Sequence, residues 1–144
     1  MWALRLPVIA FTLVVSAAAA VVPPLRPAPH HTASELADQL SASARKVAVD
    51  AAASGAPDTD GERVVAENLA GFAEDAEAIR VQITRYYIDP TPALDTLSRL
   101  NQRAWAVHRS LERAPRYRRL LEPWAVTVSL LRRLGAEIGK PPRR

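Results

Sequence analysis

The stretch VAENLAGFAEDAEAIRVQITRY, residues 65–86, decides the fold of this chain. Its apolar side chains recur in alternating steps of four and three residues, at Val65, Leu69, Phe72, Ala76, Ile79, Ile83 and Tyr86. This spacing places all of them on one side of an α-helix, whereas a strand would need every second residue to be apolar. A helix with one apolar stripe has to bury that stripe against partner helices. The stretch therefore predicts an all-α protein.

Three further segments carry the same helical spacing. Together with the stretch above, they predict helices over residues 33–54, 61–87, 92–113 and from the Ala114-Pro115 break to about residue 138. The stripe of the first segment is rich in alanine, which lets a neighbouring backbone come close. Pro123 is expected to kink or restart the last helix. Because the helices have similar lengths and short connections, we expect an antiparallel up-down-up-down four-helix bundle.

Local signals at the helix starts add detail to this prediction. Thr32 with Glu35 and Thr59 with Glu62 match the capping box, in which a hydroxyl and a carboxylate three residues apart satisfy free backbone N–H groups. Gly71 lies inside the second helix, where glycine costs about 1 kcal/mol relative to alanine. We therefore expect close packing at Gly71.

The amino-terminal residues predict export. Residues 1–20 combine Arg5, an apolar run and the small residues that precede a cleavage site after Ala20, as in a signal peptide. The alternative is an uncleaved membrane anchor, because the uncharged run 6–22 has 17 residues, the short limit for a span. Residues 21–31 hold four prolines and predict an extended linker. The bundle domain is expected over 32–139 and a basic tail over 140–144, in a periplasmic or secreted protein.

The residue types needed for common helical-bundle chemistries are missing from the sequence. With no cysteine and only Met1 as methionine, thiolate metal sites, covalent haem attachment and a Met/His haem site are excluded. Neither Glu-x-x-His nor His-Glu-x-x-His occurs. His108 and Glu112 are four residues apart and predict a surface pair. We therefore predict a non-enzymatic protein without metal or cofactor.

Charge is divided unequally along the chain. Residues 30–98 carry 12 acidic and 5 basic side chains, whereas residues 99–144 carry 3 acidic and 12 basic ones. Arginine outnumbers lysine 17 to 2, and alanine is abundant, which suggests a bacterial chain from a GC-rich genome. Five arginines surround the turn between the third and fourth helices: Arg109, Arg113, Arg116, Arg118 and Arg119.

Two interpretations of these arginines remain open. They could pair with acidic residues near the first loop, such as Asp58, Asp60 and Glu62, and so set the pairing of the helices. Alternatively, they bind an anionic partner, since guanidinium groups suit phosphate and carboxylate. For an exported protein the expected partners are anionic lipid or a cell-envelope polymer, and not nucleic acid. The sequence then indicates a binding or scaffolding protein that uses a basic face.

The large aromatic residues allow a second function. Tyr86, Trp105 and Trp124 either fill the core opposite the alanine-rich helix or line an apolar pocket. In the second case the protein would carry an apolar small molecule. The regular stripe of the second helix also makes self-association possible, and the sequence does not distinguish a monomer from a dimer.

Overall fold

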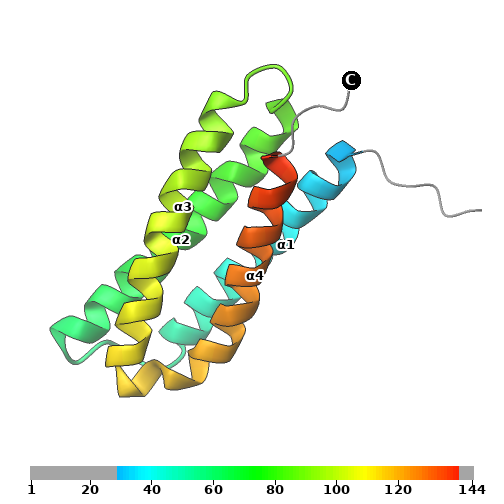
Figure 1. Cartoon of the computed structure of the whole chain (residues 1–144). Coiled ribbons are helices and arrows are strands. Elements are labelled where there is room, and N and C mark those ends of the chain that lie inside the picture. Colours follow the sequence, from blue (N-terminus) through cyan, green and yellow to red (C-terminus); the bar gives the residue numbers. More distant parts are fainter. Residues whose placement is uncertain (1–28, 140–144) are drawn as a thin grey trace, which may run out of the picture.

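The computed structural model describes residues 29–139, and within that range the chain is all-helical with no strand (Figure 1). The α-helices are α1 (Pro29–Ala52), α2 (Asp60–Gln82), α3 (Thr91–Arg113) and α4 (Leu121–Ile138). The short 3-10 helices η1 (Ile83–Arg85) and η2 (Pro115–Leu120) follow α2 and precede α4. The predicted all-α class with four helices is confirmed. The predicted signal peptide, residues 21–28 of the predicted linker and the predicted tail lie outside the described residues.

The apolar stripe of α2 lies in the core of the molecule. Six of the seven stripe residues are buried, and Tyr86 is partly exposed. The Tyr86 hydroxyl donates a hydrogen bond to the backbone carbonyl of Ile138 at 2.8 Å, which ties the segment after α2 to the end of α4. The spacing of residues 65–86 therefore identified the helix face on which the core is built.

The four helices pack around one hydrophobic core. α2 lies against both α1 and α3, and α1 also lies against α4, while α3 and α4 contact each other less extensively. In the middle, Phe72 of α2 meets Trp124 of α4 edge to face, with ring centroids 4.9 Å apart. The alanine-rich face of α1 is buried as well, including Ala37 and Ala44. Small side chains there allow α1 to contact two helices at once.

The amino-terminal ends of α1 and α2 differ from the predictions in instructive ways. α1 includes residues 29–31, which were expected in the linker, and Thr32 lies within it, so its predicted capping role is wrong. Proline suits the first turn of a helix, where the N–H that it lacks has no partner. At α2, Thr59 is the N-cap and accepts a hydrogen bond from the Glu62 N–H at 3.2 Å, as predicted. The Glu62 carboxylate, however, accepts from the Asp58 N–H, one residue earlier than in a capping box.

Two proline and glycine positions are explained by their surroundings. Pro123 is the third residue of α4, because the chain forms η2 first and restarts as α4 at Leu121. At that position the missing N–H disrupts no hydrogen bond within the helix, so the predicted restart is confirmed. At Gly71 a Cβ would collide with the guanidinium of Arg103, which crosses α2 there to pair with Asp75 at 2.7 Å. The close packing expected at Gly71 is therefore contact with an arginine side chain.

Candidate functional site

An open cleft of about 720 Å³ lies between the first turns of α2 and the last turns of α3. Residues with small side chains line it from both helices, including Gly61, Ala106 and Ser110. The remaining lining residues are Thr59, Glu62, Val64, Asn68, Gln102, Trp105, Arg109, Arg113, Ala114 and Pro115. We attribute the hollow to Gly61, Ala106 and Ser110, because their small side chains leave space above the line where the two helices meet.

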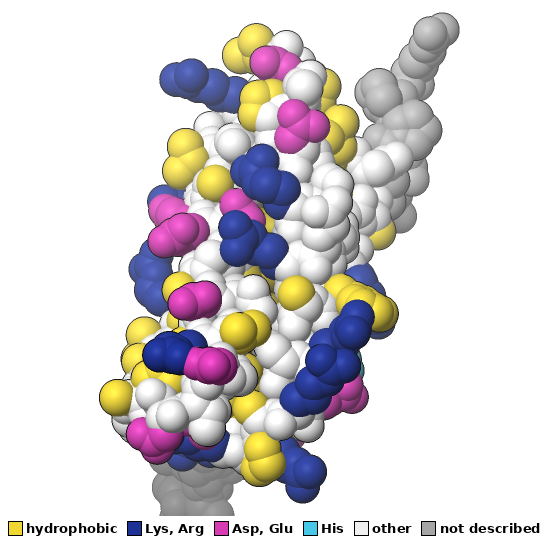
Figure 2. Space-filling model, turned by 90° about the vertical axis from the view of Figure 1, so that its left-hand side faces the viewer, with side chains coloured by type: hydrophobic (Ala, Val, Ile, Leu, Met, Phe, Trp, Pro, Cys, Tyr) yellow, Lys and Arg dark blue, Asp and Glu magenta, His cyan; other side chains and the backbone are white. Residues whose placement is uncertain are grey.

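One rim of the cleft combines an exposed tryptophan with two arginines. Trp105, Arg109 and Arg113 follow one another in steps of four residues and therefore lie in a row on α3. The Trp105 side chain is 64% exposed, although tryptophan is on average a largely buried residue. The guanidinium carbon of Arg109 lies 4.4 Å from the Trp105 ring centroid, a cation–π arrangement. In the lower part of the face that Figure 2 draws, basic side chains lie in a row beside hydrophobic ones.

The opposite rim, on α2, carries one exposed apolar side chain and one paired acid. Val64 is 46% exposed and faces the cleft. The pKa of Glu62 is lowered, first by the hydrogen bond from the Asp58 N–H and also by Arg116. Glu62 is thus ionised at neutral pH, and its charge is balanced by Arg116, 3.0 Å away. The negative charge of Glu62 is therefore already paired within the protein.

Arg116 joins η2 to the loop between α1 and α2. Its guanidinium pairs with Asp58 at 2.9 Å and with Glu62 at 3.0 Å. The same group donates two hydrogen bonds to the carbonyl of Ser54, at 2.6 and 3.2 Å. Gly55 follows with a φ of +96°, a conformation that side chains with a Cβ rarely adopt. This arginine therefore stabilises the fold, as the charge-pairing interpretation of the sequence expects.

The other four arginines of the predicted group have different surroundings. Arg119 donates a hydrogen bond to the Ser54 hydroxyl at 2.7 Å. Arg109 stacks on Trp105, as described above. Arg113 and Arg118 are exposed and make no hydrogen bond or ion pair within residues 29–139. Three of the five predicted binding residues, Arg109, Arg113 and Arg118, are therefore free of acidic partners in the described part of the chain.

The aromatic residues grouped by the pocket hypothesis are separated in the structure. Trp124 is 1% exposed and belongs to the core. Tyr86 is bound to the end of α4, and of the three only Trp105 lines the cleft. The reason is helical geometry, because Trp124 belongs to the apolar stripe of α4, while Trp105 follows the stripe residue Ala104 and so lies on another side of α3.

The sequence prediction missed the cleft and its α2 rim, including Val64 and Asn68. A signal was present, since Ala106 and Ser110 are small, four residues apart and next to the row that begins at Trp105. That signal can be interpreted only when α3 is aligned with α2.

The predicted pair of His108 and Glu112 is confirmed at 3.4 Å.

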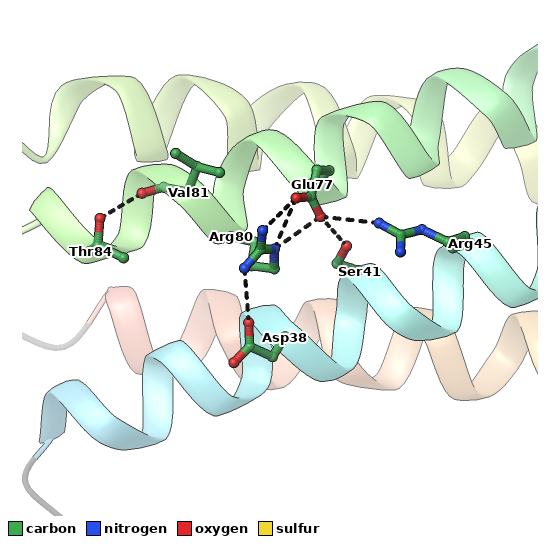
Figure 3. A network of polar contacts seen from close by, with 7 residues as sticks. All are labelled: Asp38, Ser41, Arg45, Glu77, Arg80, Val81 and Thr84. Carbon is green, nitrogen blue, oxygen red and sulfur yellow. Dashed lines mark hydrogen bonds and ion pairs between the residues drawn. The ribbon is translucent and has the colours of Figure 1, made fainter.

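A network of polar contacts joins α1 to α2 away from the cleft (Figure 3). Glu77 accepts hydrogen bonds from the Ser41 hydroxyl at 2.7 Å and from two nitrogens of Arg80, the shortest at 2.6 Å. Arg45 and Asp38 extend the network, at 3.5 Å from Glu77 and 3.7 Å from Arg80. Because the drawn charges are paired with one another, this cluster stabilises helix pairing and offers no free group for chemistry.

This network predicts a pH dependence of stability. Hydrogen bonds from Arg80 and then Ser41 lower the pKa of Glu77 from 4.5 to about 2. A depressed carboxyl pKa contributes stability that is fully present above the unfolded value and is lost as pH falls toward the folded one. We expect the melting temperature, followed by circular dichroism, to fall between pH 4.5 and 2 and to fall less in Glu77→Gln. Glu67→Gln, at an exposed site on α2, is the control, and equal slopes in all three proteins would contradict the prediction.

Residues 29–139 hold no group of three or more His, Cys, Asp or Glu side chains that could hold a metal ion. Among the helices of that same range, none has the length and apolar character needed to cross a membrane.

Comparison with known proteins adds no relative. No protein-family model matches the chain, and neither the curated proteins nor the solved structures gave a significant match.

Proposed function

We propose that this protein is a small exported, non-enzymatic binding or scaffolding protein of the bacterial envelope. The observation that carries the proposal is that Arg109, Arg113 and Arg118 are exposed within ten residues of one another and lack acidic partners in the described structure. Free guanidinium groups bind phosphate and carboxylate with two parallel hydrogen bonds. The partner is accordingly an anionic lipid surface or an anionic envelope polymer.

We also infer that the four helices form an up-down-up-down antiparallel bundle that follows a signal peptide over residues 1–20. Supporting this topology, Arg116 connects η2 to the loop after α1, and the turn between α2 and α3 lies at the other end in Figure 1. Supporting export, the leader has a positive start, an apolar run and a small-residue cleavage pattern. A basic face suits the anionic surfaces of an envelope.

Removing the three free arginines should weaken binding to anionic surfaces. We expect the protein to be retained on heparin and on anionic vesicles at about 0.15 M salt. In the triple variant of Arg109, Arg113 and Arg118 to glutamine, elution should move to lower salt, and the dependence of binding on salt should fall by about two to three ionic contacts. The salt concentration at which the protein elutes from heparin and the fraction that sediments with vesicles measure the loss of binding.

The matched control removes the same charge elsewhere. Arg85, Arg132 and Arg133 are exposed, and their side chains make no hydrogen bond or ion pair in the described structure. Their triple glutamine variant should bind nearly as well as the unmodified protein. An equal loss in both triple variants would mean that net charge alone drives binding, and no retention of the unmodified protein would refute the proposal.

A second candidate function is the carriage of an apolar small molecule. It is favoured by the exposure of Trp105 and Val64 on opposite sides of one cleft. Trp124, which the sequence places in the same predicted pocket, is buried in the core and does not line this cleft.

A further inference from the structure

We propose that the α2–α3 cleft binds a single-chain amphiphilic anion, such as a fatty acid. Its apolar chain would lie between Val64 and Trp105, and its anionic group would meet Arg109 and Arg113. This inference rests on the proposed function, because it uses two of the same arginines, and it adds the class of ligand and its orientation.

Two exposed side chains give the cleft an apolar surface. Val64 on α2 and Trp105 on α3 are 46% and 64% exposed and line the same hollow. The lining also includes small side chains at Ala106 and Ser110, which leave room for an alkyl chain. The volume of about 720 Å³ lies within the range of about 300–1,000 Å³ found for small-molecule sites. An apolar chain in this hollow would remove both side chains from water.

Two arginines on the rim fix the orientation of such a ligand. Arg109 and Arg113 are one helical turn apart, about 6 Å along the axis of α3, so one carboxylate or phosphate can contact both. Stacking on Trp105 holds the Arg109 guanidinium in place. Of the nearby acids, Glu62 is paired with Arg116, and Glu112 lies 3.4 Å from His108. Neither acid forms an ion pair with Arg113 in the described structure.

The shape of the site favours a single amphiphile over an extended surface. A flat bilayer or a thick polymer can contact the arginines on the rim, whereas a single alkyl chain is narrow enough to enter the hollow beside Ala106 and Ser110. Asn68 and Gln102, which also line the cleft, carry side-chain amides with no hydrogen bond to other residues in the described structure. They are thus available to a polar substituent of a ligand.

Quenching of tryptophan fluorescence by iodide tests the inference. Of the two tryptophans in the described residues, Trp105 is exposed and Trp124 is buried, so iodide reports on the cleft. The full chain should carry Trp2→Phe, which removes any signal from the leader. We expect decanoate, kept below micellar concentration, to protect Trp105 with a saturable dose dependence. Decanol should need at least about a tenfold higher concentration for the same protection, because it lacks the charge-assisted hydrogen bonds. Decyltrimethylammonium should not protect at all.

Three variants separate the role of the space in the cleft from that of the charged rim. Ala106→Leu fills the cleft at an exposed position without changing charge, and it should abolish protection by decanoate. Arg113→Gln should weaken the binding of decanoate about tenfold and leave the binding of decanol unchanged. Ala136→Leu on α4 is the matched control at another exposed alanine and should behave like the parent protein.

The outcomes distinguish this inference from the proposed function. If decanoate gives no protection while the arginine variants still lose heparin binding, the inference fails and the proposed function stands. If decanoate protects Trp105 but the protein is not retained on heparin, the proposed function fails and the inference stands. Equal protection by decanol and decanoate, or unchanged binding in Ala106→Leu, would overturn the inference. Protection that rises with protein concentration alone would show a second copy in the cleft, which would also overturn it.

Discussion

Replacing Trp124 by alanine is expected to lower the free energy of unfolding by about 3–5 kcal/mol. Trp124 is 1% exposed and meets Phe72 edge to face at 4.9 Å, where α4 packs across the core onto α2. Its removal leaves a cavity that the surrounding helices can close only in part. Because small domains are stable by about 5–15 kcal/mol, the variant would lose a large share of the total. Urea unfolding followed by far-ultraviolet circular dichroism measures the change.

The control for this prediction is the same substitution at the other described tryptophan. Trp105→Ala removes the same atoms from a side chain that is 64% exposed. It should change the free energy of unfolding by no more than about 1 kcal/mol, most of it from the lost contact with Arg109. If the two variants were equally destabilised, the placement of one tryptophan inside and the other outside would be wrong.

Enlarging a buried alanine of α1 should be the second most damaging change. Ala37 is 0% exposed, on the face with which α1 contacts both α2 and α4. Ala37→Leu adds three carbon atoms where the core has no room, and we expect a loss of about 1–3 kcal/mol from displaced helices and strained side chains. Thermal unfolding at neutral pH would show this as a lower melting temperature.

Ala42→Leu is the matched control for overpacking. Ala42 lies on the same helix but is exposed, and leucine and alanine differ little in helix propensity. The control should unfold near the temperature of the parent protein. A stable Ala37→Leu variant would mean that α1 is packed more loosely than the structure indicates.

The fold was predictable from sequence to the extent that it depends on one helix at a time. The stripe that begins at Val65 has a helical period, and its buried face follows from that period alone. The same holds for the break before α4, because Pro123 cannot continue a helix that began much earlier. Thr32 was misassigned because a capping motif is a local signal, and the chain before it was already helical.

The candidate site was predictable only in part. The cluster of five arginines was visible in the sequence, but their individual roles depend on neighbours from other helices. Arg116 reaches Ser54 and Asp58, which are about sixty residues away along the chain, and so becomes part of the scaffold. Arg113 has no such neighbour in the described residues and is available to a partner.

The amino-acid sequence by itself determined that this protein is helical, where its helices break and which face of each is apolar. These properties follow from spacing along a single segment, so no other part of the chain is needed to fix them. Only the tertiary structure decided that Arg116 is held by the loop after α1 while Arg113 is not, and that a cleft opens beside Arg109 and Arg113. Those features depend on the alignment of one helix with another, because a hollow between two helices exists only where small side chains from both come together.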